Sequence, residues 1–256
     1  MMEFAVRLRH ITKTFHILDE MNGDRERSRI RDGVFYALDD VSFDIEQGVC
    51  TLIAGANGSG KSLLMSIIAG LEQSDSGKLE VRGKTGLVFQ DPDSQILGET
   101  PKEDIAIGVR GKFFSKKKDS ILVVENALRE TGILSRADFP SRFLSGGEKR
   151  RLAVAGVLAM NAGIIIFDEP YANLDYPGVV QVNVLIRELL AKNRTIVILT
   201  HELEKCLALA KNFIVLYEGK TVFNGTSEEC LTLPLEQWGI HNPLHAASRL
   251  EDLIWI

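Results

Sequence analysis

The chain has 256 residues, of which 45% are hydrophobic and 25% are charged, and its formal net charge is −5. These proportions are those of a globular protein, and they exclude a disordered, collagen-like or low-complexity chain. There is no surplus of lysine and arginine to neutralise phosphates, so the acidic balance argues against sequence-independent binding of nucleic acid. We expect one large domain, with or without a small appendage, and no nucleic-acid partner.

Cysteine usage and the N-terminus suggest a cytoplasmic location. Cys50, Cys206 and Cys230 lie far apart without CxxC spacing, so neither a disulfide framework nor a cysteine zinc site is expected. The N-terminal segment MMEFAVRLRH lacks the apolar stretch of a secretory signal. No apolar run approaches the roughly 18 residues that are needed to span a bilayer.

Short apolar runs alternate with longer amphipathic stretches along the chain. The runs are rich in β-branched residues and predict buried, parallel strands, whereas the stretches have helical spacing. This alternation predicts an α/β domain with a parallel sheet covered by helices. The predicted strands are residues 50–54, 86–89, 164–167, 195–199 and 213–216. The predicted helices are residues 61–70, 121–131, 148–160, 179–192 and 203–211.

Three segments break this alternation. Residues 22–33 and 113–119 are charged and lack apolar periodicity, so we expect an exposed loop or hairpin extension and an exposed connector. The last stretch, residues 231–256, is expected to be a short C-terminal tail with one helix near residues 245–254.

Residues 55–62 match the phosphate-loop pattern GxxxxGK[ST] and lie between a predicted strand and a predicted helix, as that motif requires. Glycines let backbone N–H groups converge on phosphate oxygens, and the helix N-terminus adds free donors and partial positive charge. Lys61 is expected to reach the β- and γ-phosphates of ATP, and Ser62 to bind Mg²⁺. The predicted nucleotide-binding residues are Gly55, Ala56, Asn57, Gly58, Ser59, Gly60, Lys61, Ser62 and Leu63.

A second motif follows the predicted strand 164–167, which ends in two acidic residues. Ligands of open parallel sheets lie at the carboxyl ends of the strands, so Asp168 is expected beside the phosphate loop, where it can hold Mg²⁺. Glu169 is expected to polarise a water for attack on the γ-phosphate. The alternative is that both acids cap the turn that begins at Pro170.

The segment LSGGE, residues 144–148, opens a predicted helix, and Ser145 and Glu148 have the spacing of a capping box. A helix cap alone is one interpretation. Together with the two motifs above, however, the segment resembles the signature of ABC transporter ATP-binding subunits. This resemblance covers about residues 3–230, and residues 1–230 are taken as one ATPase domain. In that family the signature, here Ser145, Gly146, Gly147 and Glu148, faces the γ-phosphate held by the other subunit.

The resemblance implies an α/β fold of the P-loop NTPase type. Such a fold has a mostly parallel sheet core, an antiparallel β subdomain and a helical signature subdomain, here at about residues 91–160. It also implies further site residues: Gln90 as a Q-loop ligand of Mg²⁺, Asp175 of the D-loop at the dimer interface, and His201 as the switch histidine. The implied catalytic group is Glu169, His201, Gln90 and Lys61. Phe15 aligns with the aromatic residue that stacks on adenine, and Tyr36 is the alternative.

Residues 88–96 and 99–108 resemble the energy-coupling-factor branch, which imports vitamins and cobalt or nickel ions. The resemblance implies a homodimer or heterodimer of ATPases on the cytoplasmic face of the membrane. A transmembrane coupling protein and a substrate-capturing membrane protein would complete the complex. The alternatives are another ABC importer or exporter, or a soluble ABC ATPase of translation or DNA repair. Five acids and one lysine lie between Asp91 and Asp104, which would suit a basic coupling helix, or would form a solvated loop.

Overall fold

The computed structural model describes residues 3–16, 28–109 and 117–244. Its central sheet has six strands in the order β10-β9-β4-β8-β7-β6, and all five predicted strands are confirmed in it. β4, β6, β7, β8 and β9 run parallel to one another, and β10 at the edge of the sheet is antiparallel to β9. The strands are β4 (Cys50–Ala54), β6 (Thr85–Val88), β7 (Ile164–Asp168), β8 (Thr195–Leu199), β9 (Asn212–Tyr217) and β10 (Lys220–Thr226).

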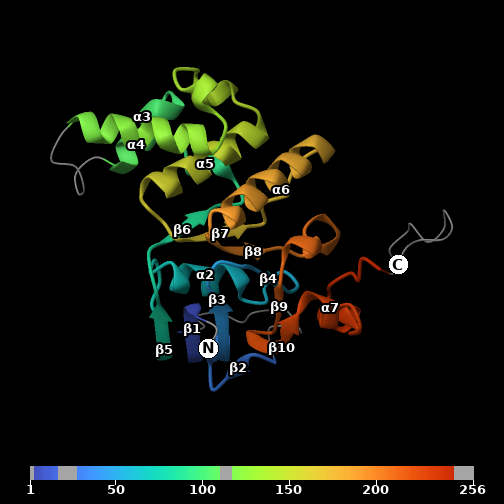
Figure 1. Ribbon diagram of the computed structural model, residues 1–256. Coiled ribbons are helices and arrows are strands. Elements are labelled where there is room, and N and C mark those ends of the chain that lie inside the picture. The colour runs from blue at the N-terminus through green and yellow to red at the C-terminus, as the bar shows by residue number, and fades with distance from the viewer. Residues whose placement is uncertain (1–2, 17–27, 110–116, 245–256) are drawn as a thin grey trace.

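Helices cover both faces of this sheet (Figure 1). On one face α5 and α6 pack on Phe167 and Ile198, and on the other α2 packs on Ile166 and Val197. Successive side chains of a strand point to opposite faces of the sheet. Because helices cover both faces, every residue of β8 is buried. The helices are α2 (Lys61–Ile68), α3 (Pro101–Val109), α4 (Lys117–Glu130), α5 (Gly146–Ala159), α6 (Tyr176–Ala191) and α7 (Ser227–Cys230).

A second, antiparallel sheet lies on the far side of α2, in the order β2-β3-β1-β5. Its strands are β1 (Phe4–His16), β2 (Ile30–Arg31), β3 (Val34–Glu46) and β5 (Ser76–Val81). The inward side chains, such as Val6 and Leu8, share one apolar core with α2 and the central sheet. The antiparallel β subdomain that the resemblance implies is therefore present, and α2 is held between two sheets.

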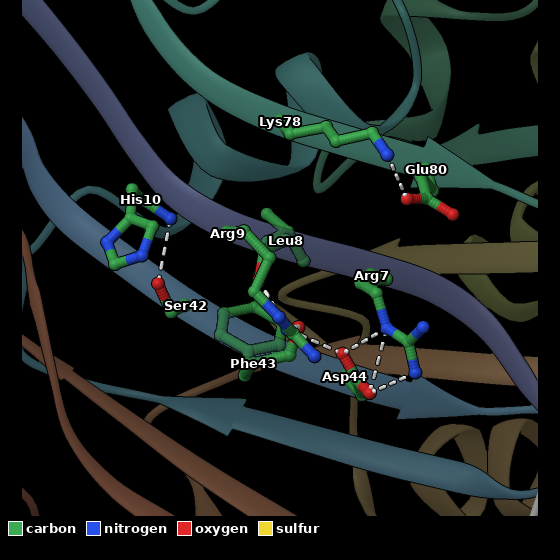
Figure 2. Close-up of polar contacts among 9 residues, drawn as sticks. All are labelled: Arg7, Leu8, Arg9, His10, Ser42, Phe43, Asp44, Lys78 and Glu80. Carbon is green, nitrogen blue, oxygen red and sulfur yellow. Dashed lines mark hydrogen bonds and ion pairs between the residues drawn. The ribbon is translucent and has the colours of Figure 1, made fainter.

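The outer face of this antiparallel sheet carries ion pairs between neighbouring strands (Figure 2). Arg7 donates to Asp44 across β1 and β3 at 2.9 Å, and Arg9 approaches the same carboxylate at 2.7 Å. Lys78 pairs with Glu80 along β5 at 2.6 Å. Ion pairs between solvent-exposed groups contribute little to stability, so burial of the inner face holds the sheet in place.

The helical group of α3, α4 and α5 has its own apolar core, to which Ile105, Leu128 and Leu152 contribute. The opposite face of α5 belongs to the core of the central sheet through Val154 and Val157. At Gly86 of β6 a Cβ atom would lie 2.1 Å from Val157, so the close contact of α5 with the sheet requires glycine there. Because α5 serves both cores, the signature helix is rigidly attached to the sheet edge.

Three predictions of local structure need correction. The helix at 203–211 is wrong: two 3₁₀ turns, Leu203–Lys205 and Leu207–Leu209, stand there. Their apolar side chains have helical spacing, but the Lys205 carbonyl accepts from the Asn183 side chain at 2.7 Å instead of a helical N–H. α3 was not predicted. The connector predicted at 113–119 is shorter than expected, because α4 already begins at Lys117. Residues 113–116 of the connector lie outside the described residues.

The described part of the segment 22–33 forms a hairpin extension, because β2 pairs with the start of β3. Residues 231–244 pack on the central core through Leu235 and Ile240, which are buried. The helix expected near residues 245–254 lies outside the described residues. In the three described ranges, no helix is both long enough and apolar enough to cross a membrane.

Candidate nucleotide-binding and hydrolysis site

The loop between β4 and α2 lines a cavity of about 860 Å³ at the carboxyl ends of the parallel strands. Its backbone is too crowded for side chains at two positions. At Gly55 a Cβ atom would lie 2.2 Å from the Leu216 carbonyl oxygen, and at Gly60, where φ is +104°, it would lie 2.8 Å from Leu38. Gly60 also precedes the first residue of α2, so no side chain competes for the first helical N–H groups. These donors are available to an anion in the cavity.

Lys61 is the cation of this loop. Its side chain is only 6% exposed and donates to the carbonyl oxygens of Gly55 at 2.7 Å and Ala56 at 3.2 Å. Burial lowers the pKa of Lys61, while the carboxylates of Glu169 and Asp168 oppose that shift. A desolvated ammonium that is held by carbonyls of the loop is well placed to bind phosphate oxygens.

Ser62 and Asp168 come together as the sequence predicts. The Ser62 hydroxyl donates to Asp168 at 3.4 Å, which links the first turn of α2 to the end of β7. Burial raises the pKa of Asp168, and the nearby Glu169 carboxylate adds to the shift. No group of three or more histidine, cysteine or acidic side chains forms a metal cage in the described ranges. One hydroxyl and one carboxylate fit Mg²⁺, which takes its other ligands from phosphates and water.

Glu169 occupies a constrained position directly after β7. Its φ is +44°, which a residue with a side chain rarely adopts, and it is 9% exposed. Oε1 lies 3.0 Å from Nδ1 of His201, whereas Oε2 is buried and has no hydrogen-bond partner among the described residues. The acids therefore engage Ser62 and His201 instead of capping the next turn. An oriented carboxylate with one free oxygen is suited to accept a proton from water.

Gln90 lines the same cavity, from the segment after β6. Its backbone carbonyl accepts from Arg150 of α5 at 2.9 Å. Arg150 is 2% exposed, and burial lowers the pKa of its guanidinium. The sequence analysis did not single out Arg150. The sequence does contain a signal for it, because an arginine with helical spacing to Ala153, Val154 and Val157 lies on the apolar face of the helix.

The signature segment lies elsewhere. The predicted capping box is confirmed: Glu148 N–H donates to the Ser145 hydroxyl at 3.2 Å, and Ser145 N–H donates to the Glu148 carboxylate at 2.9 Å. Arg136 donates to the same carboxylate at 2.9 Å. Asp175 caps α6 through Gly178 N–H at 2.9 Å. Within the described part of the chain, none of Ser145, Gly146, Gly147, Glu148 and Asp175 lines the cavity.

The aromatic residues that line the cavity are not the two that the sequence suggested for contact with adenine. Neither Phe15 nor Tyr36 is among the described residues that line it, and Tyr36 lines a separate hollow of about 130 Å³. Phe35, which stands opposite Phe15 in the pairing of β1 with β3, lines the large cavity, and so does Tyr217 of β9. Arg29 of the hairpin lies against Phe35, with its guanidinium carbon 4.5 Å from the ring centre. Sequence reasoning missed Arg29 and Phe35, because the insertion obscures which residues meet the phosphate loop.

Comparison with known proteins identifies a family and several relatives. The family model described as ABC transporter matches residues 38–172. The energy-coupling factor transporter ATP-binding protein EcfA1 of Mycoplasma mobile is 37% identical over 213 residues, which are 78% of this chain and 77% of the relative. The protein named EcfA from Carboxydothermus hydrogenoformans is 36% identical over 222 residues, 81% of this chain and 82% of the relative.

Solved structures are similar in fold. The cbiO1 protein of Clostridium perfringens, described as part of the ABC transporter complex cbiONQ, superposes with a TM-score of 0.74 at 30% identity. The match covers 89% of this chain and 90% of that one. The bacterial ABC transporter cassette MJ0796, a dimer, superposes with a TM-score of 0.71 at 24% identity, over 87% of this chain and 98% of that one. The α/β fold expected from the motifs is confirmed.

Proposed function

We propose that this chain drives an importer of the energy-coupling-factor type. The chain belongs to the ABC transporter family and is an ATPase coupled to transport. The proposed cargo is a vitamin or a cobalt or nickel ion, captured by another subunit. The main support for hydrolysis is Oε2 of Glu169, which has no hydrogen-bond partner among the described residues. Glu169 lines the same cavity as the phosphate loop. The names of the relatives EcfA1 and EcfA support the branch.

Each residue of the site has a defined task in hydrolysis. The loop residues 55–60 and the first turn of α2 hold the phosphates, with Lys61 as their cation. Mg²⁺, when bound to Ser62, Asp168 and Gln90, would neutralise charge that develops on the phosphates. Glu169 orients the attacking water and accepts its proton, while His201 holds the other carboxylate oxygen in place. Conversion of ATP and water to ADP and phosphate thus requires no covalent step with the protein.

The signature supplies the second wall of the site from a partner subunit. The N–H groups at the start of α5 that the capping box leaves free can bind the γ-phosphate held by the phosphate loop of the partner. ATP would then hold two subunits together, and its hydrolysis would let them part. Since this chain carries both Glu169 and the complete signature, it suits either a homodimer or a heterodimer. MJ0796 is described as a dimer, which is consistent with this arrangement.

The membrane partner would dock beside the Q-loop. A hollow of about 410 Å³ is lined there by Asp93, Ile96, Glu99 and Arg142 among others. The charge of this region is weaker than its composition implies. Asp93 is paired with Lys149 at 2.6 Å, and Asp104 accepts the N–H groups of residues 97 and 98. The Glu99 side chain is exposed and makes no hydrogen bond or ion pair with the other described residues. It would meet a basic helix of a transmembrane coupling protein on the cytoplasmic face of the membrane.

Purification from native membranes in detergent, followed by mass spectrometry, tests this function. We expect recovery of a coupling protein together with a small substrate-capturing membrane protein. Recovery of ribosomes or DNA in place of membrane proteins would contradict the proposal. Glu99→Lys should weaken assembly while ATP binding stays intact, and Glu228→Lys on α7 is the matched control on another surface.

A further inference from the structure

Arg29 is buried although Ser28 before it and Arg31 after it are exposed. The side chain is 7% exposed and belongs to the hairpin that precedes β3. Its guanidinium donates to three backbone carbonyl oxygens: that of Tyr36 at 2.9 Å, that of Gly58 at 2.7 Å, and that of Ala37. Burial of a charge is costly unless hydrogen bonds compensate it, and bonds from a charged donor are stronger than neutral ones. Arg29 is therefore a strong connection between the hairpin and the phosphate loop.

The contact with Gly58 acts on the tip of the phosphate loop. Because a peptide unit is planar, its C=O and the following N–H have coupled directions. The Gly58 carbonyl is held by Arg29, while the N–H of the same peptide unit, from Ser59, donates to the Ala56 carbonyl at 3.1 Å. Both ends of this peptide unit are thus fixed. The turn that surrounds the phosphates takes its shape partly from a residue outside the motif.

The same guanidinium also fixes the wall above the loop. It lies 4.5 Å from the ring centre of Phe35, and both side chains line the cavity. The turn after β9 makes room for it, since a Cβ atom at Gly219 would lie 3.0 Å from Arg29 and 2.8 Å from the Ala37 carbonyl oxygen. Gly219 N–H donates to the Ser59 carbonyl at 3.1 Å, which joins this turn to the loop as well.

We propose that Arg29 is a positioning residue for nucleotide binding, which holds the phosphate loop at Gly58 and the aromatic wall at Phe35 in one arrangement. The inference rests on the cavity being the ATP site. A preformed loop binds its ligand more tightly because the ordering cost is met before binding. Loss of Arg29 should therefore weaken every ligand that uses the loop, with or without a base. Loss of the Phe35 ring should weaken only ligands that carry a base.

Calorimetry on the full chain with MgADP and with magnesium tripolyphosphate tests this proposal. We expect Arg29→Ala to weaken both ligands by about tenfold, from the loss of a charge-assisted hydrogen bond to the loop. Arg29→Lys, which keeps the charge but not the three-fold donation, should fall between that variant and wild type. It carries the test if the alanine variant does not fold. Phe35→Ala should weaken MgADP and leave tripolyphosphate unchanged.

Arg31→Ala is the matched control. Arg31 lies two residues further along the hairpin, pairs with Asp39 at 2.6 Å and covers the Tyr36 ring at 4.5 Å, but it is not one of the described residues that line the cavity. Its loss should leave both affinities unchanged. Wild-type affinities in Arg29→Ala, or an equal loss in Arg31→Ala, would overturn the positioning role. If the wild-type chain binds neither ligand, the ATP site itself fails, and the inference fails with it.

Discussion

The phosphate loop and the signature segment each lie at the N-terminus of a helix, but they differ in side-chain capping and in their position relative to the cavity. The phosphate loop has no side-chain cap, encloses a buried lysine and lines a cavity of about 860 Å³. The signature helix is capped by Ser145 and Glu148, and its residues lie outside that cavity among the described residues. The first region is prepared for a ligand of its own subunit. The second is capped by its own side chains, and in the proposed dimer its remaining N–H donors would bind the nucleotide of the other subunit.

The comparison implies that variants of the two regions fail in different ways. Changes in the phosphate loop should affect nucleotide binding in the isolated subunit. Changes in the signature should lower turnover but leave the nucleotide affinity of the isolated subunit unchanged, because the proposed hydrolysis site needs two subunits. Glu169 stands between these cases: it lies in the cavity but acts only when the water is positioned for attack.

The largest effect is expected for Glu169→Gln. Loss of the proton acceptor should lower turnover by about 10² to 10⁴-fold, since general bases contribute that much. ATP binding should persist, and the variant should accumulate as a closed dimer with ATP. Turnover by phosphate release and dimer formation by size-exclusion chromatography would measure both. Turnover at the wild-type rate would show that Glu169 is not the base. Glu188→Gln, an exposed site on α6, is the control.

Lys61→Ala comes next. Removal of the charged donor from the phosphate loop should weaken MgATP binding by about 100-fold, which corresponds to the upper range of a hydrogen bond to a charged group. Calorimetry on the isolated subunit measures this loss. Lys78→Ala, on the exposed face of β5, should bind like wild type. Equal affinity in the two variants would contradict the role of the loop lysine.

Ser145→Ala should have a smaller effect, and it should change stability and turnover but not nucleotide affinity. Loss of an N-cap costs about 1 kcal/mol of stability. Turnover should fall about tenfold as a donor to the partner's phosphate is lost, while ATP affinity of the isolated subunit is unchanged. Thr226→Ala removes an equivalent capping box from α7, where Thr226 pairs with Glu229. It should cost similar stability without loss of turnover. Equal turnover in the two variants would reduce the signature to a helix cap.

The smallest effect is one of stability and pH. Because the pKa of Asp168 is raised by burial, its ionised form is disfavoured in the folded state. Stability of the ligand-free protein should therefore fall as pH rises from the ordinary carboxyl pKa through the raised value. Asp168→Asn should remove this loss and melt at a higher temperature than wild type at neutral pH, while it loses activity. Asp138→Asn, at an exposed site, should keep the pH dependence and the melting temperature of wild type. A lower melting temperature for Asp168→Asn at neutral pH would contradict the burial cost.

Sequence patterns located the parts of the site that are contiguous in the chain. Lys61 and Ser62 belong to one short motif, and Asp168 and Glu169 end one strand, so local patterns suffice to find them. The same patterns failed at residues 203–211, where apolar spacing is helical but a side chain of α6 takes the Lys205 carbonyl. They also failed for Arg150, whose contact with Gln90 joins two segments that are far apart in sequence.

Sequence by itself determined the α/β class, the phosphate loop and the acids of the neighbouring strand, because spacing and residue type alone specify those features. Only the tertiary structure decided which aromatic residues line the cavity, which carboxylates beside the Q-loop are already paired, and that Arg29 contacts the phosphate loop. These depend on segments brought together across the two sheets. Burial and hydrogen bonding between distant segments leave no regular spacing in the chain that could predict them.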